Sequence, residues 1–421
     1  MKKTLLTLLA AGVLMTGLCM TAAAEEPVTL QYWVVGTDET TVGQWKEICA
    51  GFEELHPDIH VEVVGQSNTI SEYETKLNAA ILSNTYPDVL NIVLAQVGSR
   101  GVLGDFEILT PYIDAWDQKD NVYESAYTMG LYEGEQVALG SGADPKLYVY
   151  RKDMFEAAGL DPENPPSTWE ELAEAAKALT IKDENGNIVQ AGLSIPAVDS
   201  SLVFTEPYMR SAGSLVIDEV NLVPSFTDEG AIEALQFIGD LYPEVSIPFN
   251  YQNQAEEDPF FYDRSAISQI SIGALRNWLN ENPDMLEKIG FMGILAHDAD
   301  TPGTSFCGYQ LYAMGSSSEH KEEAWELIKY LMSEDVLWKR YEDKGYPPVL
   351  ESLRDKYVDQ DPVVNPHVLE AIENGKGKAA VAWVSIFNKY VANAYEEVIN
   401  GKKTAEQALK DAEAALLLEI E

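Results

Sequence analysis

The sequence predicts an α/β fold in which short strands alternate with helices and form layered sheets. Two observations lead to this prediction. Hydrophobic residues make up 46% of the 421 positions, which is enough for a sizeable core, and segments with strand-like and helix-like patterns alternate along the chain. At about 100–200 residues per domain, this length predicts two or three domains rather than one.

The charge balance excludes several classes of function. The chain has 69 acidic residues against 28 Lys and Arg, a formal net charge of −41. Such a chain is repelled by phosphate backbones and by anionic lipid headgroups, so nucleic-acid binding is excluded as its main activity. The hydrophobic and aromatic content equally excludes a disordered acidic protein.

The N-terminus has the pattern of an export signal. Lys2 and Lys3 precede an apolar stretch at 5–18, and Ala22-Ala23-Ala24 has the small residues that signal peptidase prefers. The apolar stretch is short for a membrane-spanning helix, so a retained membrane anchor is the weaker alternative. We therefore predict a signal peptide at 1–24, and export to the periplasm or the cell surface.

The cysteines leave one alternative open at the N-terminus and one in the mature chain. A lipid anchor at Cys19 is possible but disfavoured, because bulky Leu18 stands where lipoprotein signals have a small residue. Cys49 and Cys307 do not form a disulfide framework or a zinc-site spacing. They are interpreted as packed thiols or, as the alternative, one long-range bridge.

The mature sequence opens with a strand-helix-strand-helix-strand pattern. Strands are predicted at 28–35, 59–64 and 88–94 from their β-branched and apolar runs. A helix is predicted at 41–55, where apolar residues recur every three or four positions, and a second one around 73–81. This short spacing implies parallel strands joined by helical crossovers.

The rest of the chain continues the alternation. The predicted elements are a strand at 147–150, helices at 152–158, 169–179, 321–332 and 404–418, and a surface turn at 183–187. Ser167 or Thr168 is predicted to cap the helix that begins at Trp169. Because no low-complexity linker is present, two lobes would be joined by several chain crossings.

The sequence contains no recognisable catalytic constellation, metal site or cofactor motif. Gly-x-Ser-x-Gly, His-Glu-x-x-His and phosphate-binding Gly-rich loops are all missing. His56 and His60 have a ligand-like spacing, but Pro57 between them interrupts the helix that would align them. With 69 acids, a pair of carboxylates suited to glycoside hydrolysis is available by chance at any separation.

Aromatic residues are more informative. Eight Trp and 21 Tyr exceed the needs of an aliphatic core, and their flat faces suit sugar rings. Trp45, Trp169 and Trp325 sit at helical spacing and are interpreted as packing residues.

Several segments together resemble a known family. They are Phe52–Val61, Pro87–Val89, Leu147–Leu160 followed by Pro166–Leu172, Ala324–Leu331 and Gly401–Leu409. They occur in the order found in family 1 extracellular solute-binding proteins, the maltose-binding-protein-like sugar receptors of ABC importers, and cover nearly the whole mature chain.

The resemblance implies a two-lobed periplasmic-binding-protein-like fold of type II, with a hinge and a ligand cleft between the lobes. The expected division puts 25–142 and 298–333 in lobe 1, and 143–297 and 334–421 in lobe 2. The implied function is a monomeric, exported receptor that captures a mono- or oligosaccharide and delivers it to the membrane permease subunits of an ABC importer. No catalysis and no cofactor are expected; a secreted glycosidase or lyase is the alternative.

The resemblance also implies nine ligand-binding positions: Thr37, Asp38, Gln96, Asp144, Glu206, Tyr208, Trp278, Tyr309 and Trp383. Glu206-Pro207-Tyr208 is similar to a Glu-Pro-Tyr in the maltose receptor. If that stretch is an extended strand, both its acid and its ring point to one side, into the cleft.

The sequence departs from the family pattern at two aromatic positions. Ser271-Ile-Gly273 replaces an expected Gly-x-Trp, and Trp278 is the nearest ring. The C-terminal aromatic pair of the maltose receptor falls on Asn388 and Lys389, with Trp383 shortly before. Maltose itself is therefore not the expected ligand. An iron cargo lacks the adjacent tyrosines it needs, and a phosphate ester would want a more basic cleft.

Overall fold

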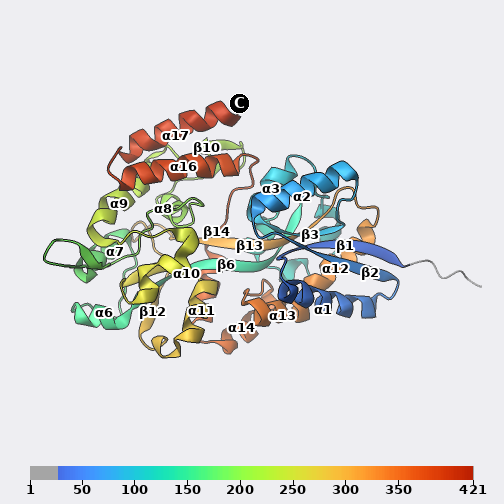
Figure 1. Ribbon diagram of the computed structural model, residues 1–421, viewed down its shortest axis with the longest axis horizontal. Coiled ribbons are helices and arrows are strands. Elements are labelled where there is room, and N and C mark those ends of the chain that lie inside the picture. The colour runs from blue at the N-terminus through green and yellow to red at the C-terminus, as the bar shows by residue number, and fades with distance from the viewer. Residues whose placement is uncertain (1–26, 421) are drawn as a thin grey trace, which may run out of the picture.

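Two long strands, β6 (Ala138–Arg151) and β13 (Ser305–Met314), run through the middle of the molecule and connect two α/β lobes (Figure 1). The structure is a computed structural model that describes residues 27–420. The predicted signal peptide and Cys19 lie outside the described residues. The mixed α/β, two-lobed architecture predicted from the sequence is therefore observed.

The first lobe begins with the predicted alternation of strands and helices. Its elements are β1 (Val28–Val35), α1 (Glu39–Leu55), β2 (Ile59–Gln66), α2 (Ile70–Ser83) and β3 (Val89–Val93). β1 lies between β2 and β3 and is parallel to both. The main sheet has the order β11-β6-β13-β3-β1-β2, so strands from distant parts of the chain complete it.

Shorter elements complete the first lobe and its connections. They are α3 (Leu94–Gly101), α4 (Thr110–Asp114), α5 (Glu124–Thr128), β4 (Leu131–Tyr132), β5 (Glu135–Gln136), α12 (Lys321–Leu331), α13 (Glu334–Lys344), α14 (Arg354–Gln360), α15 (Asn365–Glu373) and β14 (Gly375–Lys376).

The second lobe contains mostly helices around short strands. They are α6 (Lys152–Ala157), α7 (Trp169–Leu179), β7 (Ile181–Lys182), β8 (Ile188–Gln190), α8 (Thr205–Ser211), β9 (Val216–Asp218), β10 (Val223–Ser225), α9 (Glu229–Val245), α10 (Gln254–Glu257), β11 (Ile267–Ser271), α11 (Ile272–Glu281), β12 (Ile289–Met292), α16 (Val384–Ile399) and α17 (Ala405–Ile420). In Figure 1, α16 and α17 cover the upper side of this lobe.

Two local predictions are confirmed at α7 and at the hairpin that follows it. The Thr168 side chain accepts a hydrogen bond from the Glu171 N–H while the Glu171 carboxylate binds back to the turn, which forms a capping box. The turn at 183–187 joins the antiparallel pair β7 and β8.

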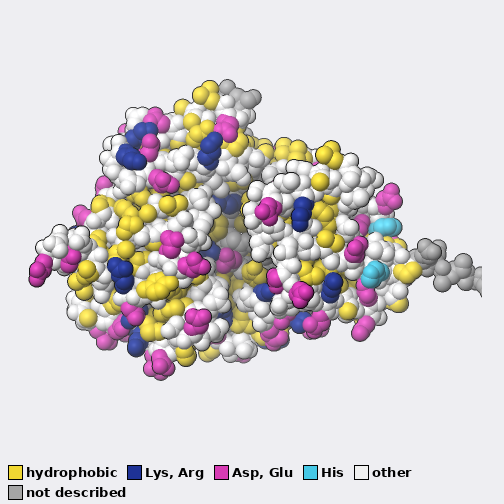
Figure 2. All heavy atoms as spheres, in the orientation of Figure 1, with side chains coloured by type: hydrophobic (Ala, Val, Ile, Leu, Met, Phe, Trp, Pro, Cys, Tyr) yellow, Lys and Arg dark blue, Asp and Glu magenta, His cyan; other side chains and the backbone are white. Residues whose placement is uncertain are grey.

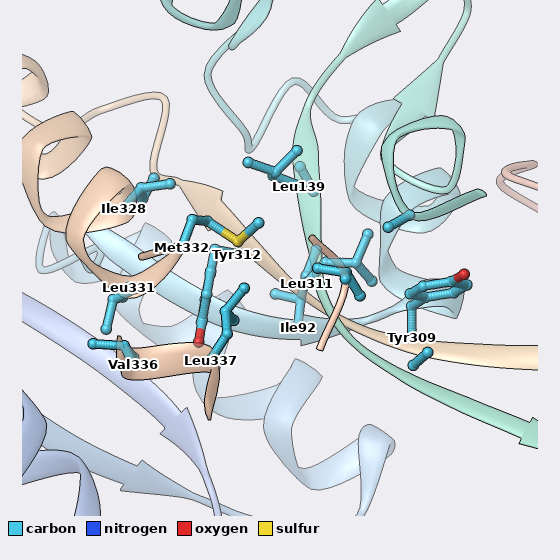
Figure 3. Packing of buried hydrophobic residues seen from close by; sticks show 14 of the residues in the cluster. Ile92, Leu139, Tyr309, Leu311, Tyr312, Ile328, Leu331, Met332, Val336 and Leu337 are labelled. Carbon is cyan, nitrogen blue, oxygen red and sulfur yellow. The ribbon is translucent and has the colours of Figure 1, made fainter. Parts of the chain in front are cut away.

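A hydrophobic core lies between the main sheet and α12–α13 in the first lobe. Figure 3 shows Tyr312 of β13 packed beside Met332 and Leu337, while Tyr309 lies apart from this group. Val336 and Leu337 follow the predicted crossing at 333, and buried residues as far as Ile372 belong to the same cluster. Buried residues of the segment 334–372 thus share one hydrophobic cluster with the strands of the main sheet.

The chain returns to the second lobe after β14. β14 pairs with Ser305–Phe306 of β13, and the following residues pass α3 before α16 begins. Gly98 of α3 permits this passage, because a Cβ there would lie 2.5 Å from the Val381 nitrogen. A second core then joins α16 and α17 to α7, α8 and α9.

The two cysteines of the described chain are both buried and free. Burial raises the pKa of the Cys49 and Cys307 thiols to about 12. The interpretation as packed thiols is confirmed, and the long-range bridge is wrong. No helix within 27–420 has the length and apolar character needed to cross a membrane.

Candidate ligand-binding groove between the lobes

A groove separates the two lobes on the face shown in Figure 2, and both basic and acidic side chains are visible in it. In the same orientation, β6 and β13 cross from one lobe to the other in this central region (Figure 1). The parallel strands β1, β2 and β3 end at a common edge of the sheet. Open α/β sheets bind ligands outside the carboxyl ends of their strands, so this edge is the natural place for a site.

The hinge strand β6 contributes an acid and a base to the junction of the lobes. β6 pairs with β13 through residues 138–145 and with β11 through residues 146–150. Asp144 lies where this pairing changes, and its carboxylate accepts a 2.8 Å hydrogen bond from the Lys146 Nζ. Asp144 is half-exposed and Lys146 is buried. Because they are two apart on a strand, both side chains point to the same side.

The first lobe contributes the loop after β1. Thr37 and Asp38 are exposed, and the Asp38 carboxylate accepts a 2.8 Å hydrogen bond from the Thr41 N–H at the start of α1. This bond holds the pKa of Asp38 below its usual value, and the nearby ammonium of Lys344 adds to the effect. Lys344 also donates a 3.0 Å hydrogen bond to the Thr41 hydroxyl.

The second lobe contributes residues around the end of β11. Burial raises the pKa of Tyr251, and the nearby carboxylates of Asp199 and Asp144 add to this effect. The Tyr251 hydroxyl donates to the Gln269 side chain at 3.2 Å. At the end of β11, Ser271 caps α11 by accepting from the Ala274 N–H. Asp144 of β6 therefore lies near Tyr251 of the second lobe.

A cavity of about 820 Å³ lies between α11 and α13. Gly273, Arg276, Asn277 and Lys344 line it, and Lys344 links it to the loop after β1. The Arg276 guanidinium lies 5.5 Å from the Tyr341 ring centre, and its Nε is buried without a hydrogen-bond partner in the described chain. Sequence reasoning missed Arg276 and Lys146, because neither belongs to a motif.

A second cavity, of about 860 Å³, lies beside the buried ion cluster of Glu206, Lys378 and Arg210. Its lining comes from α5, the β4–β5 and β9–β10 hairpins, and residues 373–380. Arg210 and Lys378 line it, and both bind the buried carboxylate of Glu206, Lys378 through its Nζ and Arg210 through an Nη2 at 3.4 Å. The structure therefore places cations between Glu206 and the cavity.

The predicted extended geometry at Glu206 and Tyr208 is wrong, because these residues lie in helix α8. Positions two apart on a helix point in different directions, so the two side chains do not share a face. The Tyr208 hydroxyl bonds to that of Tyr148 at 2.8 Å, and its ring packs 5.4 Å from Trp169 and 5.2 Å from Phe204. Tyr208 is thus part of the core of the second lobe.

The bacterial extracellular solute-binding protein family matches residues 47–371, more than half of the chain. The protein belongs to this family.

Two curated relatives and a solved structure are similar to this chain over most of its length. A binding protein of Brucella abortus is 25% identical over 96% of both chains. The sn-glycerol-3-phosphate-binding periplasmic protein UgpB of Escherichia coli is 23% identical and covers 82% of this chain and 80% of its own. The cyclic α-maltosyl-1,6-maltose binding protein of Arthrobacter globiformis shares the fold with a TM-score of 0.78, at 22% identity over 93% of this chain and 98% of its own.

Two of the predicted ligand-binding residues, Gln96 and Tyr309, have their hydrogen-bond partners inside the first lobe. Buried Gln96 accepts a hydrogen bond from the Val93 N–H and donates one to Glu74 at 2.9 Å. The Tyr309 ring is buried, and its hydroxyl lies 2.9 Å from that of Ser125, a residue that lines the 860 Å³ cavity. Both side chains are buried, 2% and 3% exposed.

The two predicted tryptophans have different surroundings. Trp278 packs with its ring centre 5.7 Å from both Phe260 and Phe261, within the second half of the chain. Trp383 is half-buried at the start of α16, 6.5 Å from Phe387, just after the segment that crosses between the lobes. Of the predicted contacts, Thr37, Asp38, Asp144, Trp278 and Trp383 keep exposed surface. Within 27–420, no three His, Cys, Asp or Glu side chains group as metal ligands.

Proposed function

We propose that this solute-binding protein is an exported, monomeric receptor that captures a mono- or oligosaccharide, or a related polyol, in the interlobe groove. It would present the ligand to the permease subunits of an ABC importer. The observation that carries this proposal is the groove itself, which lies over hinge strands shared by both lobes in a member of this family (Figure 2). A ligand there contacts both lobes only when they close.

The charges at the junction support a neutral polyhydroxy ligand. Lys146 is bonded to Asp144, and Lys344 lies near Asp38, so each of these ammonium groups already has a carboxylate beside it. Carboxylates and ammonium groups together can accept from and donate to sugar hydroxyls. A phosphate ester, which UgpB binds by its description, would face these acids. The Arthrobacter relative in fold binds a cyclic maltose derivative by its description.

We also propose a revised division of the lobes. The buried hydrophobic residues of the first cluster run without interruption from Cys307 to Ile372, whereas those from Ala379 onward belong to the second cluster. The last crossing is therefore placed at 374–380 instead of 333. Together with β6 and β13, this segment would form the hinge.

Ligand binding is expected to bring the lobes together. Small-angle scattering on the protein with saturating sugar should show a smaller radius of gyration than without it, and a mass of one chain in both states. A bound sugar with an unchanged radius would contradict the hinge. If no sugar binds in a calorimetric screen of mono- and oligosaccharides, the proposed ligand class is wrong.

Asp144→Ala is expected to weaken sugar binding by roughly 10- to 100-fold, because charge-assisted hydrogen bonds are worth about 1.5–3 kcal/mol. The melting temperature should fall only modestly, because buried Lys146 loses its partner but the Asp144 carboxylate is half-exposed and water can take its place. Asp161→Ala, which removes an acid from a surface turn, is the matched control. Equal affinity of the two variants in calorimetry would remove Asp144 from the site.

The alternative of a secreted glycosidase or lyase makes a different prediction. An enzyme would shorten or eliminate the sugar during incubation, whereas a receptor returns it unchanged. Chromatography of an oligosaccharide recovered after prolonged incubation distinguishes the two. New products that disappear with Asp144→Ala would favour the enzyme.

Processing of the N-terminus is proposed to follow Ala24. Ala22 and Ala24 fit signal peptidase, while Leu18 disfavours lipid attachment at Cys19. N-terminal sequencing of the exported protein should begin at Glu25. If the first residue is instead a lipid-modified Cys19, cleavage after Ala24 is wrong and the receptor is anchored to the membrane.

A further inference from the structure

A groove of about 1000 Å³ lies on the outer face of the first lobe, between α4 with its flanking residues and helix α12. We call it the α4–α12 groove and define it by Tyr112, Trp116, Asp117, Glu322, Trp325 and Glu326. None of these residues lines the 860 Å³ cavity or the 820 Å³ cavity. The α4–α12 groove is therefore separate from the site described above.

Three aromatic rings form its apolar part. Trp325 is only 6% exposed and forms the base. The Tyr112 ring centre lies 5.6 Å from it, and the Trp116 ring meets it edge to face at 5.9 Å and 84°. Tyr112 and Trp116 are only half-buried, so these two rings keep surface that faces the groove. Packing between α4 and α12 alone would not need the exposed part of these rings, so that surface is available to a ligand.

Hydrogen-bonding groups surround the rings. Glu322 and Asp117 are exposed, and Glu326 is bonded to Lys329 at 2.7 Å. Desolvation raises the pKa of Tyr112, and the carboxylate of Glu322 adds to this effect, so the acid and the ring lie close together. Acceptors and donors at the rim of an exposed aromatic surface are the chemistry that recognises a pyranose, whose C–H face stacks while its hydroxyls hydrogen-bond.

We propose that the α4–α12 groove is a second carbohydrate-binding site, which takes a short stretch of a neutral oligo- or polysaccharide on the outer face of the first lobe. Its volume is at the upper end of the range for small-molecule sites. All of its residues come from one lobe, so its affinity does not change when the lobes close. A site of this kind holds a long glycan near the receptor while the interlobe groove takes a smaller ligand, and it stands on its own observations.

Native gel electrophoresis in the presence of soluble starch, xylan, β-glucan or galactomannan tests the proposal. At least one polysaccharide should retard the wild-type protein. Tyr112→Ala and Trp116→Ala should each weaken that retardation about threefold to tenfold, as the loss of one stacked ring predicts. Tyr262→Ala, which removes a 56% exposed ring elsewhere, should bind as the wild type does. Asp144→Ala should still be retarded, because the interlobe site is not involved.

A second pair of variants keeps the test valid if a ring variant loses its fold. Glu322→Gln and Asp117→Asn alter exposed acids of the groove, and Glu184→Gln in the 183–187 turn is the matched control. Weaker retardation in the first two variants only, with unchanged melting temperatures, supports the site. The proposal is overturned if no polysaccharide retards the wild-type protein. It is equally overturned if retardation is lost in Asp144→Ala and kept in Trp116→Ala and Glu322→Gln.

Discussion

Tyr208→Ala is expected to lower the free energy of unfolding by about 3–5 kcal/mol, the usual cost of deleting a large buried ring. Tyr208 is 2% exposed and packs against Trp169 and Phe204, so its removal leaves a cavity in the second core. Urea unfolding followed by tryptophan fluorescence measures the change. Tyr262→Ala, at a ring that is 56% exposed, should cost much less and is the matched control.

Tyr208→Phe separates the ring from its hydroxyl. It keeps the packing but leaves the Tyr148 hydroxyl without its 2.8 Å partner, so a loss of about 1–3 kcal/mol is expected. Tyr208→Ala with normal stability and lost sugar binding would show that the ring faces the ligand in solution. That outcome would restore the contact that the sequence predicts and contradict the core position described here.

Glu206→Ala is expected to destabilise the protein by a similar amount, about 3–5 kcal/mol, because it leaves two cations without their shared carboxylate. The side chains of Glu206, Lys378 and Arg210 are 3%, 9% and 10% exposed, so water compensates the unpaired charges only in part. The melting temperature should therefore fall strongly. Glu184→Ala, at an exposed acid in a turn, should leave it nearly unchanged.

A double-mutant cycle tests whether Glu206 acts through the ion pair. Combining Glu206→Gln with Lys378→Met removes both charges, so the loss should be smaller than the sum of the single losses. Strictly additive losses would mean that the pair is not formed. Sugar affinity of the two folded single variants is a second readout. If Glu206 contacts the ligand directly, Glu206→Gln should weaken sugar binding more than Lys378→Met does. If Glu206 only positions Lys378, Lys378→Met should weaken sugar binding at least as much as Glu206→Gln.

Local structure is what the sequence by itself determined. The alternation at the start of the chain, the helix cap at Thr168, and the turn at 183–187 all appear at the predicted places. These features depend on interactions between residues a few positions apart, such as the period of apolar side chains and the hydrogen bonds of a cap. The resemblance of several short segments, in the order found in the family, then indicated the two-lobed fold. Both the segments and their order can be read from the sequence without knowing any tertiary contact.

Only the tertiary structure decided which polar side chains are buried and which partners satisfy them. Glu206 meets Lys378 across 172 positions, Tyr208 meets Tyr148 across 60, and Tyr309 meets Ser125 across 184. The side of α8 that is buried depends on such distant partners and not on neighbouring residues. A buried acid or tyrosine is tolerated only where a partner satisfies it, and a partner that far away along the chain leaves no mark in the local pattern.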